Sequence, residues 1–409
     1  MVMDKEIPKG FQKTEIGIIP NDWLLVSYNE VFDFLPSATY SRAQLTLNDE
    51  IKYVHYGDIH TKWIHFLDVS KSDLPSIKTE QQKNYPLLKE GDLLTVDASE
   101  DYTGVGKSVE VRNIGNSKII SGLHTFLLRD SNNIIANGYK GYLHSNLLIK
   151  KQMDTLATGL KVYGVSKTNL KLIKIPLPPT KAEQTAIVTA LNDADKLITE
   201  LEKLIAQKKL IKQGAMQELL RPKEGWEVKK LGIYLKFQVG FPFSSKNFNT
   251  DLTGIRLVKN RDLKSDDSII FYDGQYAIDF VVNNNDVLIG MDGDFIPCLW
   301  GKGISLLNQR VGRIIPFKKI SLLFLYYYLQ KPLKTIENRT SSTTVKHLSH
   351  SDIEEIELPL PDYTTQIKIS LILSDMDSEI KSLEKKLNKY KMIKQGMMQN
   401  LLTGKIRLI

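Results

Sequence analysis

The 409-residue sequence contains a single cysteine, Cys298. One thiol can form neither an internal disulfide nor a zinc site built from cysteines, so disulfide-stabilised scaffolds and zinc fingers are excluded. Sparse cysteine is typical of a reducing compartment. The sequence also lacks an apolar run near the roughly 18 residues of a membrane span, and Met1 to Lys5 lead into polar sequence rather than a secretory signal. We therefore expect a soluble, cytoplasmic protein.

Motifs for nucleotide binding and methyl transfer are also missing. Gly106-Lys107-Ser108 resembles the end of a phosphate-binding loop, but Asp101 stands where that loop needs its first glycine. Gly104-Val105-Gly106 and Gly301-Lys302-Gly303 lack the third glycine of a dinucleotide-binding turn. No Asn-Pro-Pro-aromatic or Asp-Pro-Pro-aromatic tetrapeptide occurs. The sequence therefore predicts a chain without catalytic residues of its own.

The acidic and histidine residues suggest no metal site. His55, His60 and His65 are five residues apart on a predicted strand and loop, a spacing that suits no metal. His347 and His350 lie in a Ser/Thr-rich loop without an acidic companion, and Asp292-Gly293-Asp294 is more typical of a hairpin turn. We expect this chain to bind no metal and no cofactor.

Charge and length permit several functions. The 55 Lys and Arg exceed the 47 Asp and Glu by a net charge of +8, which permits a polyanionic partner without requiring one. With 42% hydrophobic residues, a chain of this length can fill two to four domain cores.

An internal repeat organises the chain. Residues 179–220 align with 361–402 at a constant offset of 182, and 19 of the 42 aligned pairs are identical. Proline clusters at 176–179 and 359–361 precede the two copies and cannot continue a helix. Apolar residues then recur at alternating spacings of four and three, as in a coiled coil. The repeat predicts two helices of about 40 residues, each roughly 60 Å long, that pack on each other.

The segments between these helices are predicted to be globular α+β domains. Short β-branched and aromatic runs predict strands at 51–56, 93–96, 119–128, 269–272 and 287–289. Helices are expected at 139–156 and 322–337, and the run Tyr326-Tyr327-Tyr328 is interpreted as a buried helix face. The expected order is domain, long helix, domain, long helix.

These features together resemble the specificity subunit of type I restriction-modification systems. The resemblance rests on Pro176 to Gln184, the two Ile-Lys-Gln-Gly stretches, Gly240-Phe241-Pro242-Phe243, Asp286 to Ile289, Leu307 to Val311 and Ser341 to Thr344, in that order around the 182-residue duplication. It implies an α+β fold in which two target recognition domains are separated by two long helices that form an antiparallel coiled coil, with an internal pseudo-twofold repeat. The domains are expected at 1–175 and 222–357, and the helical spacer regions at 176–221 and 358–409.

The resemblance also implies a function and partners. Each recognition domain would read one half of a bipartite site in double-stranded DNA, while the helices set the spacer and dock two methylation subunits. Two restriction subunits would complete a DNA adenine methyltransferase and ATP-dependent endonuclease. S-adenosylmethionine, ATP and Mg would then be bound by those partner subunits and not by this chain.

Candidate DNA contacts are cations, hydroxyls, amides and aromatics in predicted loops, because arginine suits guanine and the side-chain amides of Asn and Gln suit adenine. In the first domain they are Tyr40, Arg42, Lys62, Trp63, Lys107, Lys161 and Tyr163. In the second domain they are Ser245, Lys246, Lys259, Asn260, Arg261, Gln309, Arg310, Thr343 and Lys346.

Candidate docking residues are polar side chains that recur in both helices, on faces predicted to be exposed. They are Gln184, Asp193, Asp195, Lys212 and Gln213, with their counterparts Gln366, Asp375, Asp377, Lys394 and Gln395. Salt bridges within the coiled coil are the alternative explanation for their repetition.

Two other functions stay open at this point. The chain could be a coiled-coil adaptor without DNA readout, which failure to bind DNA even with methylation subunits would indicate. It could also be a self-contained DNA-modifying enzyme, which DNA cleavage or methylation by the purified chain would establish.

Overall fold

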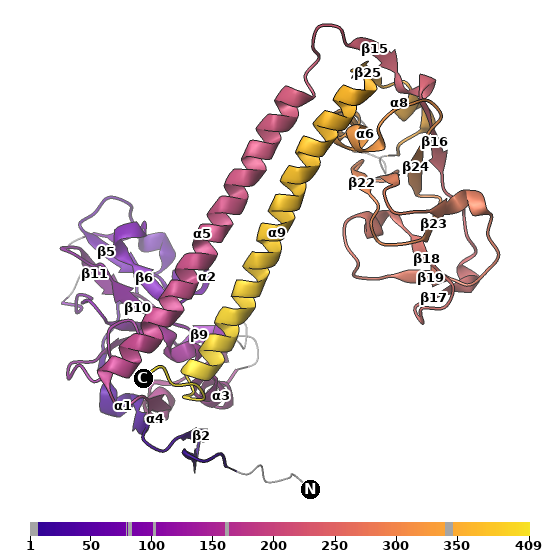
Figure 1. The fold of residues 1–409 in the computed structure, drawn as a ribbon. Coiled ribbons are helices and arrows are strands. Elements are labelled where there is room, and N and C mark those ends of the chain that lie inside the picture. Colours follow the sequence, from indigo (N-terminus) through magenta and orange to yellow (C-terminus); the bar gives the residue numbers. More distant parts are fainter. Residues whose placement is uncertain (1–6, 79, 81–83, 101–103, 160–162, 340–346) are drawn as a thin grey trace. The chain divides into compact units, whose positions relative to one another are not determined.

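The computed structural model describes residues 7–78, 80, 84–100, 104–159, 163–339 and 347–409 (Figure 1). The chain divides into two compact units, of which the first comprises Met1–Leu201 and Lys386–Ile409 and the second Glu202–Lys385. Each unit contains one globular domain and one part of each of two long helices, α5 (Lys181–Leu219) and α9 (Tyr363–Leu401). The predicted order of domains and helices is confirmed.

The two long helices begin where the sequence predicts. Thr180 and Asp362 accept backbone N–H groups of the first turns, Glu183 N at 3.2 Å and Thr365 N at 3.0 Å, as N-capping residues do. Each helix has 39 residues, or about 58 Å at 1.5 Å per residue. Both lie inside the helical regions expected at 176–221 and 358–409, while the domain boundaries themselves stay predictions.

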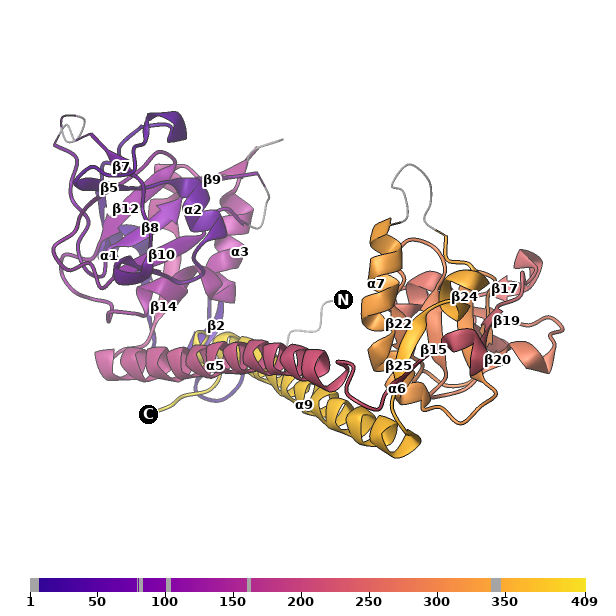
Figure 2. The ribbon, with the colours of Figure 1, turned by 90° about the horizontal axis from the view of Figure 1, so that it is seen from above.

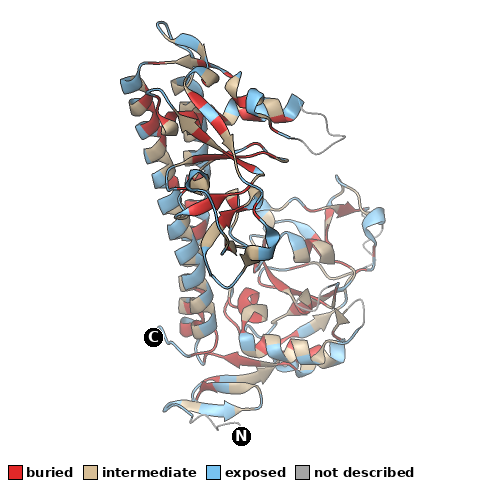
Figure 3. Ribbon diagram, turned by 90° about the vertical axis from the view of Figure 1, so that its right-hand side faces the viewer, coloured by how far each residue is buried: buried red, intermediate tan, exposed pale blue. Residues whose placement is uncertain are grey.

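Within each unit the helices pack antiparallel (Figures 1 and 2). In the first unit, Ile187 and Leu191 near the start of α5 share a core with Leu401 at the end of α9. In the second unit, Leu219 at the end of α5 packs against the core that contains Ile369 near the start of α9. The antiparallel coiled coil is therefore confirmed. Exposed residues cover much of both helices, whereas buried residues follow the strands of the domains (Figure 3).

The first domain is built on two sheets. The larger sheet has the strand order β4 (Asp33–Leu35), β12 (Thr125–Arg129), β8 (Leu93–Val96), β10 (Ser108–Arg112) and β6 (Phe66–Asp68). The smaller sheet has the strand order β11 (Lys118–Ser121), β5 (Ile51–Val54) and β7 (Ser76–Ile77). Three two-stranded ladders are β1 (Phe11–Thr14) with β2 (Gly17–Pro20), β3 (Leu24–Ser27) with β14 (Lys174–Leu177), and β9 (Ala98–Ser99) with β13 (Tyr163–Gly164). The helices are α1 (Tyr28–Val31), α2 (Tyr56–Thr61), the 3-10 helix η5 (Lys140–Ser145), α3 (Leu147–Leu156) and α4 (Lys167–Leu172).

The second domain has a similar plan. One sheet has the order β16 (Leu235–Val239), β24 (Val311–Pro316), β21 (Val287–Gly290), β22 (Pro297–Leu299). The other sheet has the strand order β17 (Phe248–Asn249), β19 (Ile270–Tyr272), β18 (Ile255–Val258), β23 (Ser305–Leu307) and β20 (Val281–Val282). Separately, β15 (Glu227–Lys230) pairs with β25 (Glu357–Leu360). The helices are α6 (Leu322–Tyr328), α7 (Gln330–Arg339) and α8 (His350–Glu354), with 3-10 turns η7 (Ser245–Asn247) and η8 (Asn260–Leu263). Both domains are α+β, as predicted.

The strands predicted at 269–272 and 287–289 differ from β19 and β21 by one residue each, and two other predicted strands differ more. The strand predicted at 51–56 ends at Val54, because His55 caps helix α2 by accepting the Gly57 N–H at 3.0 Å. The strand predicted at 119–128 is two strands, β11 and β12. Between them Gly122 lies so close to the ring of Tyr53 that a Cβ there would come within 2.4 Å, and His124 has a positive φ of 57°.

Both predicted domain helices are interrupted. The first breaks at Asn146, whose side chain caps α3 by accepting the Leu148 N–H at 2.9 Å. The second breaks between α6 and α7, because Pro332 has no amide to donate to the carbonyl four residues earlier. Tyr327 is 2% exposed, so the tyrosine run does include a buried helix face. No helix within the described ranges is long and apolar enough to traverse a membrane.

Candidate nucleic-acid interface

In the first unit, two candidate cations are held by one buried carboxylate. Asp58, at the start of α2, is 2% exposed, and its Oδ1 lies 3.0 Å from Arg42 Nη2 and 3.4 Å from Lys62 Nζ. Nδ1 of His55 lies 3.3 Å from the same Arg42 nitrogen. Burial, followed by the Arg42 guanidinium, lowers the pKa of His55. Asp58 therefore fixes Arg42 and Lys62 side by side, while their side chains stay 59% and 47% exposed to a ligand.

The other candidates of the first domain are more enclosed. Tyr40 is 8% exposed and its ring packs against Tyr53 and Tyr85, which argues against a base contact there. Trp63 is half-buried, and its Nε1 donates to Ser72 Oγ at 3.2 Å. Lys107 Nζ donates to the His60 carbonyl at 2.8 Å. Tyr163 is half-buried in strand β13. Lys161 lies outside the described residues.

In the second unit, Asp292 contacts residues from three other segments of the chain. Its carboxylate lies 3.1 Å from Arg310 Nη1 and 3.0 Å from His347 Nδ1, and its carbonyl accepts the Asn260 Nδ2 group at 2.6 Å. His347 thus has an acidic companion, contrary to the sequence analysis. The sequence could not reveal it, because Asp292 and His347 are 55 residues apart and meet through an isolated β-bridge.

The remaining candidates of the second domain differ in exposure. Lys259 Nζ lies 4.6 Å from the centroid of the Phe248 ring, and burial, followed by Arg261, lowers its pKa. Arg261 is exposed and donates to Ser268 Oγ at 3.0 Å. Oε1 of Gln309 is buried and has no hydrogen-bond partner among the described residues. Ser245 and Lys246 are exposed in η7, and Thr343 and Lys346 lie outside the described part of the chain.

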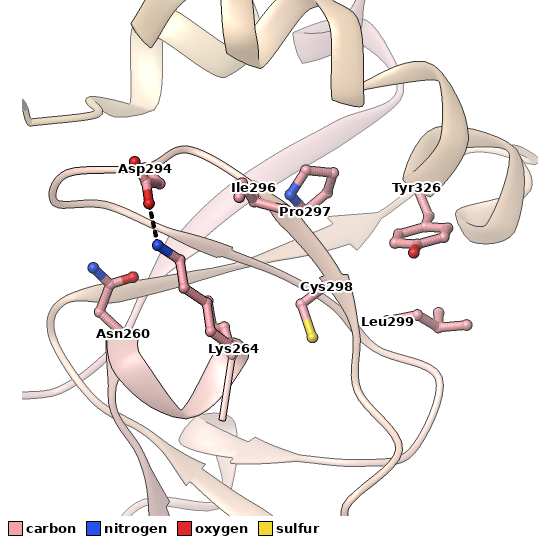
Figure 4. Close-up of a pocket in the computed structure, with 9 residues that line it drawn as sticks. Asn260, Lys264, Asp294, Ile296, Pro297, Cys298, Leu299 and Tyr326 are labelled. Atoms are coloured by element: carbon pink, nitrogen blue, oxygen red, sulfur yellow. Dashed lines mark hydrogen bonds and ion pairs between the residues drawn. The ribbon is translucent and has the colours of Figure 1, made fainter. Parts of the chain in front are cut away.

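Next to Asn260 lies a small pocket of about 290 Å³ (Figure 4). Lys264 reaches across it to form an ion pair with Asp294, and Cys298 and Tyr326 also line it. Burial raises the pKa of the Cys298 thiol, so this group is a poor nucleophile. The Lys264–Asp294 pair links the turn that carries Asn260 to the loop that follows Asp292.

One turn of each loop cluster, the turn with Asp58 in the first domain and the turn with Asn260 in the second, occupies an equivalent position in its domain. β5 pairs in parallel with β11 and β18 in parallel with β23, and a helical turn follows β5 and β18 directly. The fourth residue after each strand is a buried aspartate, Asp58 or Asp262, with exposures of 2% and 1%. The shared spacing is a signal in the sequence that was not used to choose the candidate residues. It is present as Val54-His55-Tyr56-Gly57-Asp58-Ile59 and Val258-Lys259-Asn260-Arg261-Asp262-Leu263.

Two of the candidate docking residues are not on an exposed face. Gln184 and Gln366 are each 2% exposed. Oε1 of Gln184 accepts the Ala136 N–H at 2.7 Å, and Oε1 of Gln366 accepts the Ser321 N–H at 2.9 Å. Their amide nitrogens donate to proline carbonyls just before the helices, at 3.1 and 2.9 Å. The prediction of an exposed face is therefore wrong for both glutamines, which tie the start of each helix to its domain.

Four other docking candidates form ion pairs between the helices. Lys394 Nζ lies 2.5 Å from Asp195 Oδ1 in the first unit, and Lys212 Nζ lies 2.5 Å from Asp377 Oδ1 in the second. For these four residues the structure shows salt bridges within the coiled coil, which was the alternative to docking. Docking stays a prediction for the exposed candidates, which are Asp193, Gln213, Asp375 and Gln395.

Comparison with known proteins agrees with this architecture. A protein of Methanocaldococcus jannaschii named as a type I restriction enzyme MjaX specificity subunit is 26% identical over 430 aligned residues, which cover 98% of this chain and 97% of that protein. The EcoBI specificity subunit of Escherichia coli is 32% identical over 204 residues, 49% of this chain and 43% of that protein. The crystal structure of the type I restriction-modification S subunit from M. genitalium has the same fold, with a TM-score of 0.56 at 14% identity over 97% of this chain and 98% of that one.

The family model for the type I restriction modification DNA specificity domain matches residues 20–213 and 223–391. These two matches include both globular domains, both loop clusters and most of the long helices. The chain therefore belongs to the type I restriction-modification DNA specificity family.

Proposed function

We propose that this chain is the DNA-reading subunit of a type I restriction-modification complex, in which each domain reads one half of a split target. The observation that carries the proposal is the pair of loop clusters, one in each unit, each of which includes the turn that follows the first strand of a parallel pair. Each cluster combines exposed cations with residues whose hydrogen bonds fix their position. Arginine in such a cluster can donate two hydrogen bonds to guanine.

The long helices would set the spacer between the half-sites. A helix is stiff along its axis, and both helices are continuous over 39 residues. Their length fixes a distance in steps of 1.5 Å per residue, whereas duplex DNA advances about 3.4 Å per base pair. A change in helix length would therefore change the number of base pairs between the half-sites.

Catalysis would belong to partner chains. Two methylation subunits that use S-adenosylmethionine would dock on the exposed polar residues of the helices, and two restriction subunits would supply ATP- and Mg-dependent cleavage. The repetition of Asp193 and Gln213 as Asp375 and Gln395 supports two equivalent docking sites. The completed complex would methylate adenine in the sequence that this chain selects.

Domain exchange tests the proposal. Comparison of DNA methylation in cells with and without the gene first gives the target of the wild-type chain. Replacement of residues 1–175 by the corresponding segment of a relative should then change one half-site and leave the other unchanged. Replacement of residues 222–357 should change the opposite half only. A change in both halves after either exchange would contradict separate reading by the two domains.

A further inference from the structure

In the first unit, one carboxylate joins the globular domain to both long helices. Tyr142 lies in η5 of the domain and is fully buried, and its Oη donates to Asn192 Oδ1 at 3.0 Å and lies 3.5 Å from Asp195 Oδ2. Asp195 belongs to α5, and its other oxygen accepts Lys394 Nζ of α9 at 2.5 Å. Domain, first helix and second helix therefore meet at Asp195.

The second unit has a similar contact with the helices exchanged, in which the tyrosine bonds to the aspartate more closely than in the first unit. Tyr327 lies in α6 of the domain, and its Oη donates to Asp377 Oδ2 at 2.8 Å. Asp377 belongs to α9, and its Oδ1 accepts Lys212 Nζ of α5 at 2.5 Å. The ammonium group of Lys212 also lies 5.4 Å from the centroid of the Tyr327 ring. Asp377 and Lys394 are the counterparts of Asp195 and Lys212 at the 182-residue offset, so the duplication preserves the aspartate and the lysine, whereas the two tyrosines are 185 residues apart.

These bonds differ from the other ion pairs of the coiled coil. Lys208 pairs with Glu379 at 2.6 Å and Lys209 with Glu384 at 2.7 Å. These two ion pairs involve residues of the two helices alone. The side chains of Lys394 and Lys212 are only 12% and 17% exposed, whereas those of their aspartate partners are 40% and 38% exposed, so these ion pairs are half-buried. Burial, followed in each case by the neighbouring aspartate, raises the pKa of Tyr142 and Tyr327. Both phenols therefore stay protonated and able to donate at neutral pH.

The geometry gives these bonds a role that apolar packing cannot supply. Hydrophobic contact is itself non-directional, so directional bonds add to the packing a preference for one angle of the domain on its helices. A hydrogen bond weakens steeply when its donor is misaligned, and bonds to a charged acceptor are the stronger ones. Rotation of a domain about its helices would break the contact at the aspartate. The tyrosine, aspartate and lysine together fix the orientation of the domain on the helix pair.

We propose that Tyr142, Asp195 and Lys394 in the first unit, and Tyr327, Asp377 and Lys212 in the second, are positioning residues that set which spacer length the chain accepts. They touch no DNA and act by holding each reading loop cluster at a fixed angle to the helices. This inference rests on the proposed function, because it concerns the distance between the two half-sites.

The test uses the full chain with its methylation subunits and DNA duplexes that carry the half-sites found in the wild-type methylome. The spacer is one base pair shorter than, equal to, or one base pair longer than the native one. Tyr142→Phe and Tyr327→Phe remove only a hydroxyl and keep the packed ring. Each variant should reduce the affinity ratio between native and altered spacers by about fivefold, since a lost buried hydrogen bond corresponds to such a factor. Base preference within each half-site should stay the same.

Tyr328→Phe is the matched control. Tyr328 lies on the same helix as Tyr327, and its hydroxyl donates to the Glu357 carbonyl inside the domain at 3.2 Å. Its loss should leave spacer discrimination unchanged. Asp195→Asn and Asp377→Asn provide a second pair of variants, which weaken the lysine contact while keeping an acceptor oxygen, and should also relax the spacer.

Three results would overturn the inference. Unchanged spacer discrimination in the tyrosine and aspartate variants would show that these bonds do not set the spacing. An equal loss in Tyr328→Phe would assign the effect to general loosening of the domain. Altered base preference within a half-site would place the residues in readout instead of positioning. A wild-type chain that selects no split target would contradict the proposed function itself, which separates that failure from a failure of this inference.

Discussion

The imidazole rings of His65 and His144 lie 5.2 Å apart, centroid to centroid, inside the first domain. His65 is 5% exposed, and Nδ1 of His144 is buried without a hydrogen-bond partner among the described residues. Burial, followed by the charge of Lys394 for His65 and by the nearby His65 ring for His144, lowers the pKa of each ring to about 3. Both histidines are therefore neutral in the folded chain at neutral pH.

Acid should destabilise the first unit. A histidine with a lowered pKa in the folded chain binds a proton more readily once unfolded, so the free energy of unfolding falls as the pH drops from about 6.5 towards 3. Between pH 7.5 and pH 5.0 the loss should be about 4 kcal/mol for the pair, which is roughly 2 kcal/mol for each ring. Thermal unfolding at the two pH values measures it.

His144→Gln is the comparison for this prediction. The variant should lose about half of the pH dependence, because one titrating ring is gone. Glu110 acts in the opposite sense, because burial raises its pKa and its contribution to stability is lost as the pH rises. Wild type and His144→Gln both contain Glu110, so its effect cancels in the comparison. An identical shift in melting temperature in wild type and variant would rule out the histidine pair as its source.

The buried glutamines should contribute to stability. Gln184→Ala leaves the Ala136 N–H and the Pro178 carbonyl without their partner, and Gln366→Ala does the same to Ser321 and Pro361. Each substitution should cost about 1 to 3 kcal/mol of unfolding free energy. Urea unfolding measures the change. Gln213→Ala, at an exposed position of α5, should stay within about 0.5 kcal/mol of wild type, and an equal loss there would contradict the burial argument.

Arginines from the two loop clusters should act on separate half-sites. Arg42→Ala should weaken or relax recognition only in the half read by the first domain, and Arg310→Ala only in the other half. Loss of an arginine that contacts a base should cost about 1 to 3 kcal/mol of discrimination. Binding to duplexes with single base changes in either half measures the effect. Uniform weakening across all sequences would instead assign the arginine to a phosphate contact.

Helix length should control the spacer. Four residues inserted at Gln213-Gly214-Ala215 in α5, matched by four at Gln395-Gly396-Met397 in α9, add about 6 Å and about one turn. Each domain then keeps nearly the same facing on the DNA. Methylation should move to sites with the same half sequences and a spacer longer by about one base pair. Retained activity at the original spacer would show that the helices do not set this distance.

Local signals in the sequence were sufficient for the architecture. The 182-residue duplication, the proline clusters and the apolar seam predict two long helices, because helix length and periodicity depend on neighbouring residues. The α+β domains follow from short β-branched runs for the same reason. Element bounds were less accurate where a single tertiary or capping contact decides them, as at Gly122, which approaches the Tyr53 ring, and at Asn146, which caps a new helix.

The partners of the polar side chains depended on the tertiary structure. Repetition of Gln184, Asp195 and Lys212 in the second helix suggested docking faces, yet the glutamine is buried in its domain and the aspartate and lysine bind across the helix pair. Lys394 and Asp195 are 199 residues apart, and Asp292 meets His347 across 55. Periodicity tells which face of an element is apolar, but it carries no information on which distant residue a polar group will meet. Only the folded chain, which must satisfy the hydrogen bonds and charges that it buries, decides that pairing.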